Sequence, residues 1–233
     1  MKKIIVLTLI LSLLCSCSLM GDYGNMIDES KLDFDAQLSN PNEGEEIAVI
    51  TTTAGVIKLK LFPNHAPNAV NNFTTLAKEG YYNDSFVFFI EPDVAFMAGT
   101  KDKQGQEATT IFEENKPFKN EYTDALWHFS GSVSALSVNK HLADSRFFIT
   151  ASTDVSEEIL SSMSRVGYPQ KLIDKYKEKG GVPGLDKNYT IFAQTFEGFD
   201  VIDKIMSSQT DEDGVPTSDV KIITIEITQY TEE

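Results

Sequence analysis

Cysteine is scarce in this chain, and its position is informative. The 233 residues contain two cysteines, Cys15 and Cys17, and both lie near the N-terminus. The rest of the chain has none. A folded body without cysteine cannot contain a disulfide, which excludes the small disulfide-stabilised folds.

The chain begins with a hydrophobic run that is too short to span a bilayer. Residues 4–14 are predominantly apolar and follow the basic pair Lys2 and Lys3. A membrane-spanning helix needs about 20 apolar residues, whereas a run of this length is typical of the core of a signal peptide. We therefore expect residues 1–16 to be a leader that is removed.

The end of this run resembles a lipoprotein cleavage site. Cys17 has an aliphatic residue, Leu14, three positions before it and a small residue, Ser16, directly before it. Cys15 does not fit, because Leu14 would directly precede it. We expect Cys17 to carry a lipid that anchors the protein on the outer side of a bacterial membrane. The alternative is a plain signal peptide that is cut further along the chain.

Basic residues are also few. The chain has 20 Lys and Arg against 35 Asp and Glu, a formal charge of −15. Removal of Lys2 and Lys3 with the leader gives 18 − 35 = −17. Such a charge disfavours binding to nucleic acid and repels an anionic membrane surface, so that a lipid would have to hold the protein there.

Histidines are rare and scattered. His65, His128 and His141 show no metal-ligand spacing, no convincing Ser/His/Asp order is present, and the glycine-containing turns lack a phosphate-loop pattern. The sequence predicts no metal site.

What the chain does contain is a series of short β-rich runs. Residues 17–45 are polar and turn-forming, and we expect a flexible tether there. Residues 46–230 form the predicted body, with helices after Pro67 and at 199–206. Many short strands with few helices favour an antiparallel barrel or sandwich. The polar segment 154–183 has helical spacing and predicts a helical insertion. The predicted strands lie at residues 47–53, 56–62, 86–90, 94–99, 131–138, 147–151, 189–196 and 220–228.

Six motifs in a fixed order resemble the cyclophilin family of peptidyl-prolyl isomerases. They are APNAVNNF at 66–73, GYY at 80–82, GSVSAL at 131–136, DSRFFI at 144–149, LDKNYTIF at 185–192 and EGFDVIDKI at 197–205. The resemblance spans residues 47–228. It implies a closed antiparallel β-barrel of about eight strands, capped by two helices, with 154–183 as an insertion similar to one in bacterial lipoprotein members.

The resemblance also implies a reaction. Cyclophilins bind a proline ring in an apolar pocket and direct an arginine guanidinium at the X-Pro amide. The donor favours the twisted amide, whose nitrogen lone pair is localised, without a covalent step, a metal or a cofactor. The expected partners are proline-containing peptides or unfolded secreted proteins. We expect no nucleic acid partner, and a monomer.

This sequence departs from the family at the catalytic positions. Phe88 stands where the family has its arginine, and Met97 where it has the glutamine that orients it. Arg146 occupies the position of a different family glutamine. It either reaches the same pocket as a substitute donor, or is a surface residue paired with Asp144 or another carboxylate.

The apolar lining of the pocket is kept in part. Each lining residue could also serve core packing alone. Gly184 stands where some members have tryptophan, which would remove one wall. Leu136 replaces an alanine and would narrow the site. The candidate substrate-binding residues are Val94, Leu136, Phe148, Leu185 and Tyr189.

Two functions are consistent with this pattern. The first is an extracytoplasmic prolyl isomerase with reduced activity. The second is a non-catalytic lipoprotein that binds proline peptides for chaperoning or adhesion. Loss of the arginine and its glutamine partner favours the second mechanistically, whereas fold and predicted location fit both.

Overall fold

The computed structural model describes residues 27–139 and 141–232. The predicted signal peptide and Cys17 lie outside these residues. In the part of the chain that the structure describes, no helix is both long enough and apolar enough to cross a membrane.

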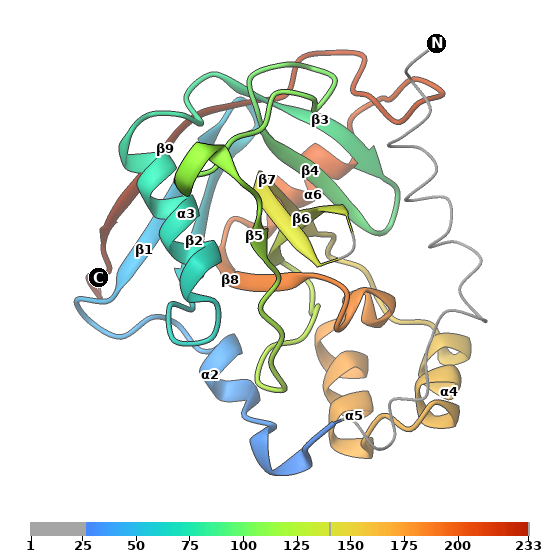
Figure 1. Cartoon of the computed structure of the whole chain (residues 1–233). Helices are drawn as coiled ribbons and strands as arrows, with labels where there is room; N and C mark the ends of the chain where they lie inside the picture. The colour runs from blue at the N-terminus through green and yellow to red at the C-terminus, as the bar shows by residue number, and fades with distance from the viewer. Residues whose placement is uncertain (1–26, 140, 233) are drawn as a thin grey trace.

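A closed antiparallel barrel forms the body of the molecule (Figure 1). The strands follow the order β4-β3-β9-β1-β2-β8-β6-β7, and pairing of β4 with β7 closes the ring, while the short β5 pairs with β7 from outside it. The strands are β1 (Glu46–Thr52), β2 (Gly55–Leu61), β3 (Ser85–Glu91), β4 (Ala95–Thr100), β5 (Phe118–Lys119), β6 (Ser132–Asn139), β7 (Leu142–Thr150), β8 (Thr190–Glu197) and β9 (Lys221–Gln229).

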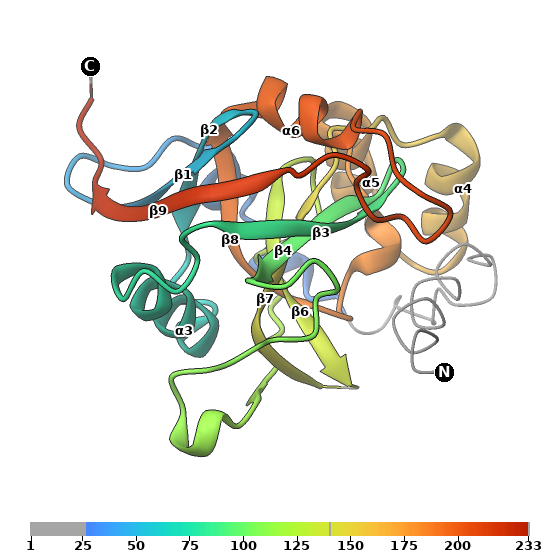
Figure 2. The same cartoon turned by 90° about the horizontal axis from the view of Figure 1, so that it is seen from above.

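Two of the helices, α3 and α6, pack on the barrel and lie on opposite sides of it in Figure 2. Their apolar faces complete the core that fills the barrel. The helical segments are η2 (Glu29–Lys31), α2 (Phe34–Leu38), α3 (Pro67–Lys78), η3 (Glu113–Asn115), α4 (Glu157–Arg165), α5 (Gln170–Lys179), η4 (Pro183–Leu185) and α6 (Phe199–Met206).

Helix α3 is capped at its N-terminus by a side chain that is distant in the sequence. Pro67 occupies its first turn, and the preceding Ala66 provides no side-chain cap. Instead, the carboxylate of Glu121 accepts hydrogen bonds from the backbone N–H groups of Asn68 and Ala69, each at 3.1 Å. A negative charge at this end also complements the helix dipole. The sequence did not indicate this contact, because its partners are more than 50 residues apart.

Glycine ends the same helix. Gly80 has φ +72, a left-handed conformation that a residue with a Cβ adopts only at a cost. The N–H of Tyr81 then bonds the carbonyl of Leu76 at 2.9 Å, which closes the last turn. Gly80 thus follows the C-cap residue Glu79 of α3, whose last helical residue is Lys78.

Alternation along the strands decides which side chains fill the barrel. On β7, Phe147 and Ile149 belong to the barrel core, whereas Phe148 faces the other side of the wall. On β4, Phe96 points inward and Met97 outward in the same way. A period of two follows from the pleat of an extended chain, so one strand contributes to two separate clusters.

A second core lies below the barrel in Figure 1, and α2, α4 and α5 contribute side chains to it. Its residues include Phe34 from α2, Trp127 and Phe129 from the segment before β6, and Tyr176 from α5. The Phe129 and Tyr176 rings lie 4.7 Å apart. The insertion therefore has its own hydrophobic core against the barrel.

The described part of the predicted tether, residues 27–45, is not a free spacer. Phe34 is 5% exposed and Gln37 is fully buried. The Gln37 side chain donates to the Trp127 carbonyl at 2.7 Å and accepts from the Trp127 N–H at 2.9 Å. The sequence suggested a tether because this stretch has no long periodic pattern. Its order comes from contacts with Trp127, with Lys60 of β2 and with Lys171 of the insertion.

The predicted fold class is confirmed: a closed antiparallel barrel with eight strands in the ring, helices on its ends and a helical insertion. Helix α6 has the predicted bounds, 199–206.

Candidate active site

An apolar cluster lies on the outer face of the barrel wall, and we call it the outer cluster. Strands β3, β4, β6 and β7 and the turn η4 contribute to it. Its buried members are Phe88, Phe89, Ala95, Met97, Leu136, Phe148 and Leu185, with Val94, Val182 and Tyr189 half-buried at its edge.

The structure brings together the apolar residues that the sequence predicted for the site. Phe88, Met97 and all five candidate substrate-binding residues belong to the outer cluster. They come from separate parts of the chain. The β-ladders place Met97 opposite Phe89 on one side and opposite Phe148 on the other.

A bulge directs Phe88 into this cluster. Val87 pairs with Ala98 and Phe89 pairs with Met97, so Phe88 is an extra residue in β3. Because of the bulge, Phe88 and Phe89 both face the outer cluster instead of alternating. The Phe88 ring packs against Gly105: a Cβ on this glycine would lie 2.6 Å from two of its ring atoms.

The positions that resemble the catalytic pair are thus filled by apolar side chains. Phe88 is 3% exposed and Met97 is 6% exposed. Neither can donate a hydrogen bond to an amide. Leu136, which replaces a smaller family residue, is also buried in the cluster.

Arg146 lies beside this cluster and is held at three nitrogens. Its Nε and Nη2 donate to the two carboxylate oxygens of Asp144 at 3.1 and 2.7 Å, and its Nη1 donates to the Gly105 carbonyl at 2.9 Å. The side chain is 16% exposed. Since Gly105 packs on Phe88, a single residue separates the guanidinium from the Phe88 ring.

Arg146 therefore pairs with Asp144 and also lies close to the outer cluster, so the structure contains elements of both sequence-based alternatives. A two-pronged bond to a carboxylate fixes the plane of a guanidinium, and Arg is suited to it. These contacts use three of the five N–H groups of the side chain.

Tyr189 forms an aromatic wall of the cluster. Its ring packs edge-on against Phe148 with centroids 5.0 Å apart. Burial raises the pKa of the Tyr189 hydroxyl, and the nearby Tyr122 adds to the effect. The hydroxyl of Tyr189 therefore stays protonated at neutral pH.

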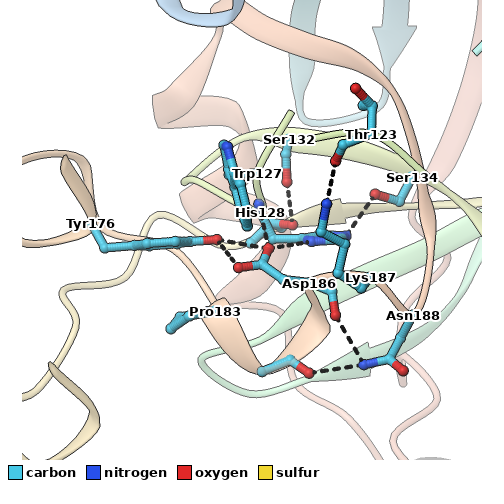
Figure 3. A network of polar contacts seen from close by, with 12 residues as sticks. Thr123, Trp127, His128, Ser132, Ser134, Tyr176, Pro183, Asp186, Lys187 and Asn188 are labelled. Atoms are coloured by element: carbon cyan, nitrogen blue, oxygen red, sulfur yellow. Dashed lines mark hydrogen bonds and ion pairs between the residues drawn. The ribbon is translucent and has the colours of Figure 1, made fainter. Parts of the chain in front are cut away.

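Behind the cluster lies a buried polar network that the sequence did not reveal (Figure 3). His128 Nδ1 lies 2.9 Å from Asp186 Oδ1, and His128 Nε2 lies 3.1 Å from Ser134 Oγ. The His128 ring also stacks on Phe148, with an interplanar angle of 12°. The residues come together only in the folded barrel, since Asp186 is 58 positions from His128.

The order Ser134–His128–Asp186 has the hydrogen-bonding pattern of a nucleophilic triad, but not its accessibility. Ser134 and His128 are fully buried, and Asp186 is 2% exposed. The cavity beside His128 has a volume of about 10 Å³. It holds at most one water molecule. Because Ser134 itself is fully buried, its hydroxyl is closed to a substrate carbonyl. The network stabilises the structure behind the site.

No metal centre accompanies this arrangement in the described residues: no three His, Cys, Asp or Glu side chains gather closely enough to hold an ion. His128 is engaged by Asp186 and Ser134.

Comparison with known proteins identifies the family. The sequence profile of the family described as cyclophilin type peptidyl-prolyl cis-trans isomerase/CLD matches residues 47–227. The chain belongs to the cyclophilin-type peptidyl-prolyl isomerase family. A protein from Staphylococcus saprophyticus with a provisional peptidyl-prolyl cis-trans isomerase name is 33% identical over 194 residues, which cover 83% of this chain and 98% of the relative.

Two further cyclophilins show similarity in sequence or in fold. A provisionally named peptidyl-prolyl cis-trans isomerase of Staphylococcus aureus is 31% identical over 79% of this chain and 93% of its own length. A crystal structure of a Cryptosporidium parvum cyclophilin, determined in the presence of the dipeptide Ala-Pro, aligns with a TM-score of 0.63 and 21% identity, covering 79% of this chain and 99% of that one. Its likeness supports the fold.

Proposed function

We propose that this cyclophilin is an extracytoplasmic prolyl isomerase of reduced activity, held at a bacterial membrane through Cys17, that acts on X-Pro bonds of secreted or surface proteins. Family membership supports the reaction. The observation that carries the proposal for this chain is the position of Arg146, next to Gly105 and the Phe88 ring. No other arginine in the sequence lies within the predicted site, because Arg165 is in the insertion.

In this proposal Arg146 replaces the missing donor. The proline ring would rest on the outer cluster, and a free N–H of the guanidinium would face the amide nitrogen. A hydrogen bond to the localised lone pair stabilises the twisted amide more than the planar one, which is what lowers the barrier. Asp144 keeps the donor oriented but also offsets part of its charge. We therefore expect catalysis weaker than with an unpaired arginine.

The second candidate is a peptide-binding lipoprotein without catalysis. The burial of Phe88 and Met97 favours it, because these side chains occupy the positions of the donor and its orienting partner with apolar atoms. The apolar surface for proline would remain, while the amide would find no donor.

An isomerisation assay on an X-Pro peptide separates the two. We expect the wild-type protein to accelerate isomerisation above the uncatalysed rate, and Arg146→Ala to lower kcat/KM by about 10²-fold, as for loss of one preorganised donor. Arg165→Ala, which removes the other arginine of the chain, is the matched control and should retain the rate. Full activity in Arg146→Ala would refute the donor role. Peptide binding without any acceleration would establish the second candidate.

A further inference from the structure

The insertion is connected to the candidate active site by a direct polar contact. Tyr176 on α5 donates its hydroxyl to both carboxylate oxygens of Asp186, each at 2.8 Å (Figure 3). Tyr168, also in the insertion, donates to Asp186 Oδ2 at 3.1 Å. Both tyrosines are buried, and Tyr176 is fully so.

Asp186 is placed where it can control the site. It directly follows Leu185 and precedes Tyr189 by three residues, and both belong to the outer cluster. Its Oδ1 also accepts from the backbone N–H of His128 at 3.0 Å and lies 2.9 Å from His128 Nδ1. The ring of His128 in turn stacks on Phe148.

A buried carboxylate fixes its surroundings because it must keep its donors. Loss of the Tyr176 hydroxyl leaves Asp186 with fewer hydrogen bonds, from His128 and Tyr168 only, so the segment that carries the carboxylate shifts to improve those that remain. Burial raises the pKa of Tyr176, and the charge of Asp186 adds to the rise. Tyr176 therefore stays protonated and remains a donor.

The segment that carries Asp186 has limited support of its own. Its turn η4 is three residues long and contains only local backbone hydrogen bonds. The N–H of Leu185 donates to the Val182 carbonyl, and the N–H of Asp186 donates to the Pro183 carbonyl. The bonds from α5 add a fixed point outside the turn. The position of the turn relative to the barrel is thus set jointly by His128, which bonds Val182 and Asp186, and by the insertion.

We propose that Tyr176 is a positioning residue of this cyclophilin: through Asp186 it sets where Leu185 and Tyr189 stand, so that one hydroxyl of the insertion helix α5 supports the peptide-binding site from outside it. This inference rests on the proposed function, because it takes the outer cluster as the surface that binds the proline peptide. It assigns a role in binding to a segment outside the barrel.

The test compares Tyr176→Phe with Ile173→Val in the full chain. Tyr176→Phe removes the hydroxyl and keeps the ring that packs on Phe129. Ile173 lies on the same helix, is 6% exposed and belongs to the same core, but it has no polar contact to lose. Both changes lower stability modestly, so an effect of stability alone would appear in both. The emission of Trp127, the only tryptophan in the sequence, shows that each variant is folded.

Two readouts are needed. The first is the affinity for a proline-containing peptide, which we expect to fall about tenfold in Tyr176→Phe, equivalent to about 1.4 kcal/mol, and to stay unchanged in Ile173→Val. The second is the NMR signals of the Leu185 methyl groups and the Tyr189 ring, which we expect to shift only in Tyr176→Phe. Unchanged affinity and unchanged signals in Tyr176→Phe would overturn the proposal.

The two readouts also distinguish this inference from the proposed function. If the wild-type protein binds no proline peptide, the proposed function fails, and the role of Tyr176 in binding fails with it. Shifts of the Leu185 and Tyr189 signals would then show a structural link only. If wild-type binding is normal and Tyr176→Phe leaves it intact, the positioning role alone is wrong. If Tyr176→Phe does not fold, Tyr168→Phe, which removes the 3.1 Å bond, should reproduce a smaller loss of affinity, and unchanged binding in that variant would contradict the proposal.

Discussion

The position of Arg146 beside Phe88 allows an arginine to be introduced at position 88 and the present one to be removed in a double-mutant cycle. The variants are Phe88→Arg, Arg146→Gln and their combination. The Arg146 Nη1 lies 2.9 Å from the Gly105 carbonyl, and the Phe88 ring packs against the same glycine. A guanidinium at position 88 would therefore lie close to that of Arg146.

The size of the effect follows from Coulomb's law. Two like charges about 7 Å apart at a partly buried site, with an effective dielectric constant of about 20, repel by about 2 kcal/mol. Arg146→Gln removes this repulsion but leaves Asp144, 7% exposed, without its guanidinium partner. That loss is common to both backgrounds and cancels unless the guanidinium at position 88 pairs with Asp144 in the double variant. Such pairing would add to the coupling with the same sign, and it too requires that the two guanidinium groups share one site.

Urea unfolding followed by Trp127 fluorescence gives the free energy of unfolding for each variant. We expect the double variant to be about 2 kcal/mol more stable than the sum of the single effects predicts. The coupling should shrink in about 1 M salt, because exposed parts of the interaction are screened. Phe88→Arg combined with Arg165→Gln, on the exposed side of α4, is the control and should be additive.

Additivity of Phe88→Arg and Arg146→Gln within about 0.5 kcal/mol would refute the reasoning. It would mean that the two guanidinium groups do not share one site. The assignment of Arg146 as the substitute donor would then lose its geometric basis.

Three further predictions concern the folded body, and a fourth concerns the predicted lipid anchor. Gly105→Ala should lower the free energy of unfolding by about 2–4 kcal/mol, because φ is +66 and the new Cβ would meet the Phe88 ring at 2.6 Å. The control is Gly184→Ala, whose Cβ meets nothing within 4 Å. It should change the free energy of unfolding by less than about 0.5 kcal/mol in the same urea titration. Stability should fall as the pH rises above 10, since burial raises the pKa of Tyr82 and Tyr176 well above the ordinary value of 10.0, so the unfolded chain loses these protons first. Each tyrosine lowers the free energy of unfolding by about 1.4 kcal/mol per pH unit up to its folded-state pKa. An unchanged slope in Tyr176→Phe would contradict this. Phe88→Arg alone should gain little isomerase activity, because an arginine without an orienting partner samples many rotamers, whereas Phe88→Arg with Met97→Gln should gain more; equal rates would show that Met97 is not the partner position. Cys17→Ser should move the protein from the membrane fraction to the soluble fraction, and retention of Cys17→Ser on the membrane would exclude lipid attachment at this residue.

The barrel was predictable because its information is local and repeated. The alternation in β2, where Ile57 and Leu59 are buried between less buried neighbours, is present in the sequence itself. The stop at Gly80 is equally local, since it depends on the φ angle of one residue. Six motifs in the right order then fixed the family. None of these inferences needs knowledge of which distant residues meet.

The features that the sequence did not indicate all depend on distant contacts. Glu121 caps a helix that begins more than 50 residues earlier, and Gln37 is ordered by Trp127, 90 residues away. Asp186 belonged to a recognised motif, yet its partners Tyr176 and His128 could be found only in the fold. The bulge at Phe88 is a further case, because it depends on the register with β4. Periodicity predicts which face of an element is buried, but not what it meets there.

Arg146 shows why the two roles that the sequence left open do not exclude each other. A catalytic donor must be held still, because a freely rotating side chain places its N–H on the amide only rarely. In the family resemblance a glutamine does this, and here Asp144 does it with two bonds. A carboxylate is a stronger partner than an amide, and it also withdraws part of the positive charge that stabilises the transition state. Orientation is therefore gained at the expense of donor strength. Better orientation with a weaker donor predicts a slow isomerase instead of an inactive one. Asp144→Asn keeps a polar partner without its charge, and this substitution should raise kcat if Arg146 is the donor.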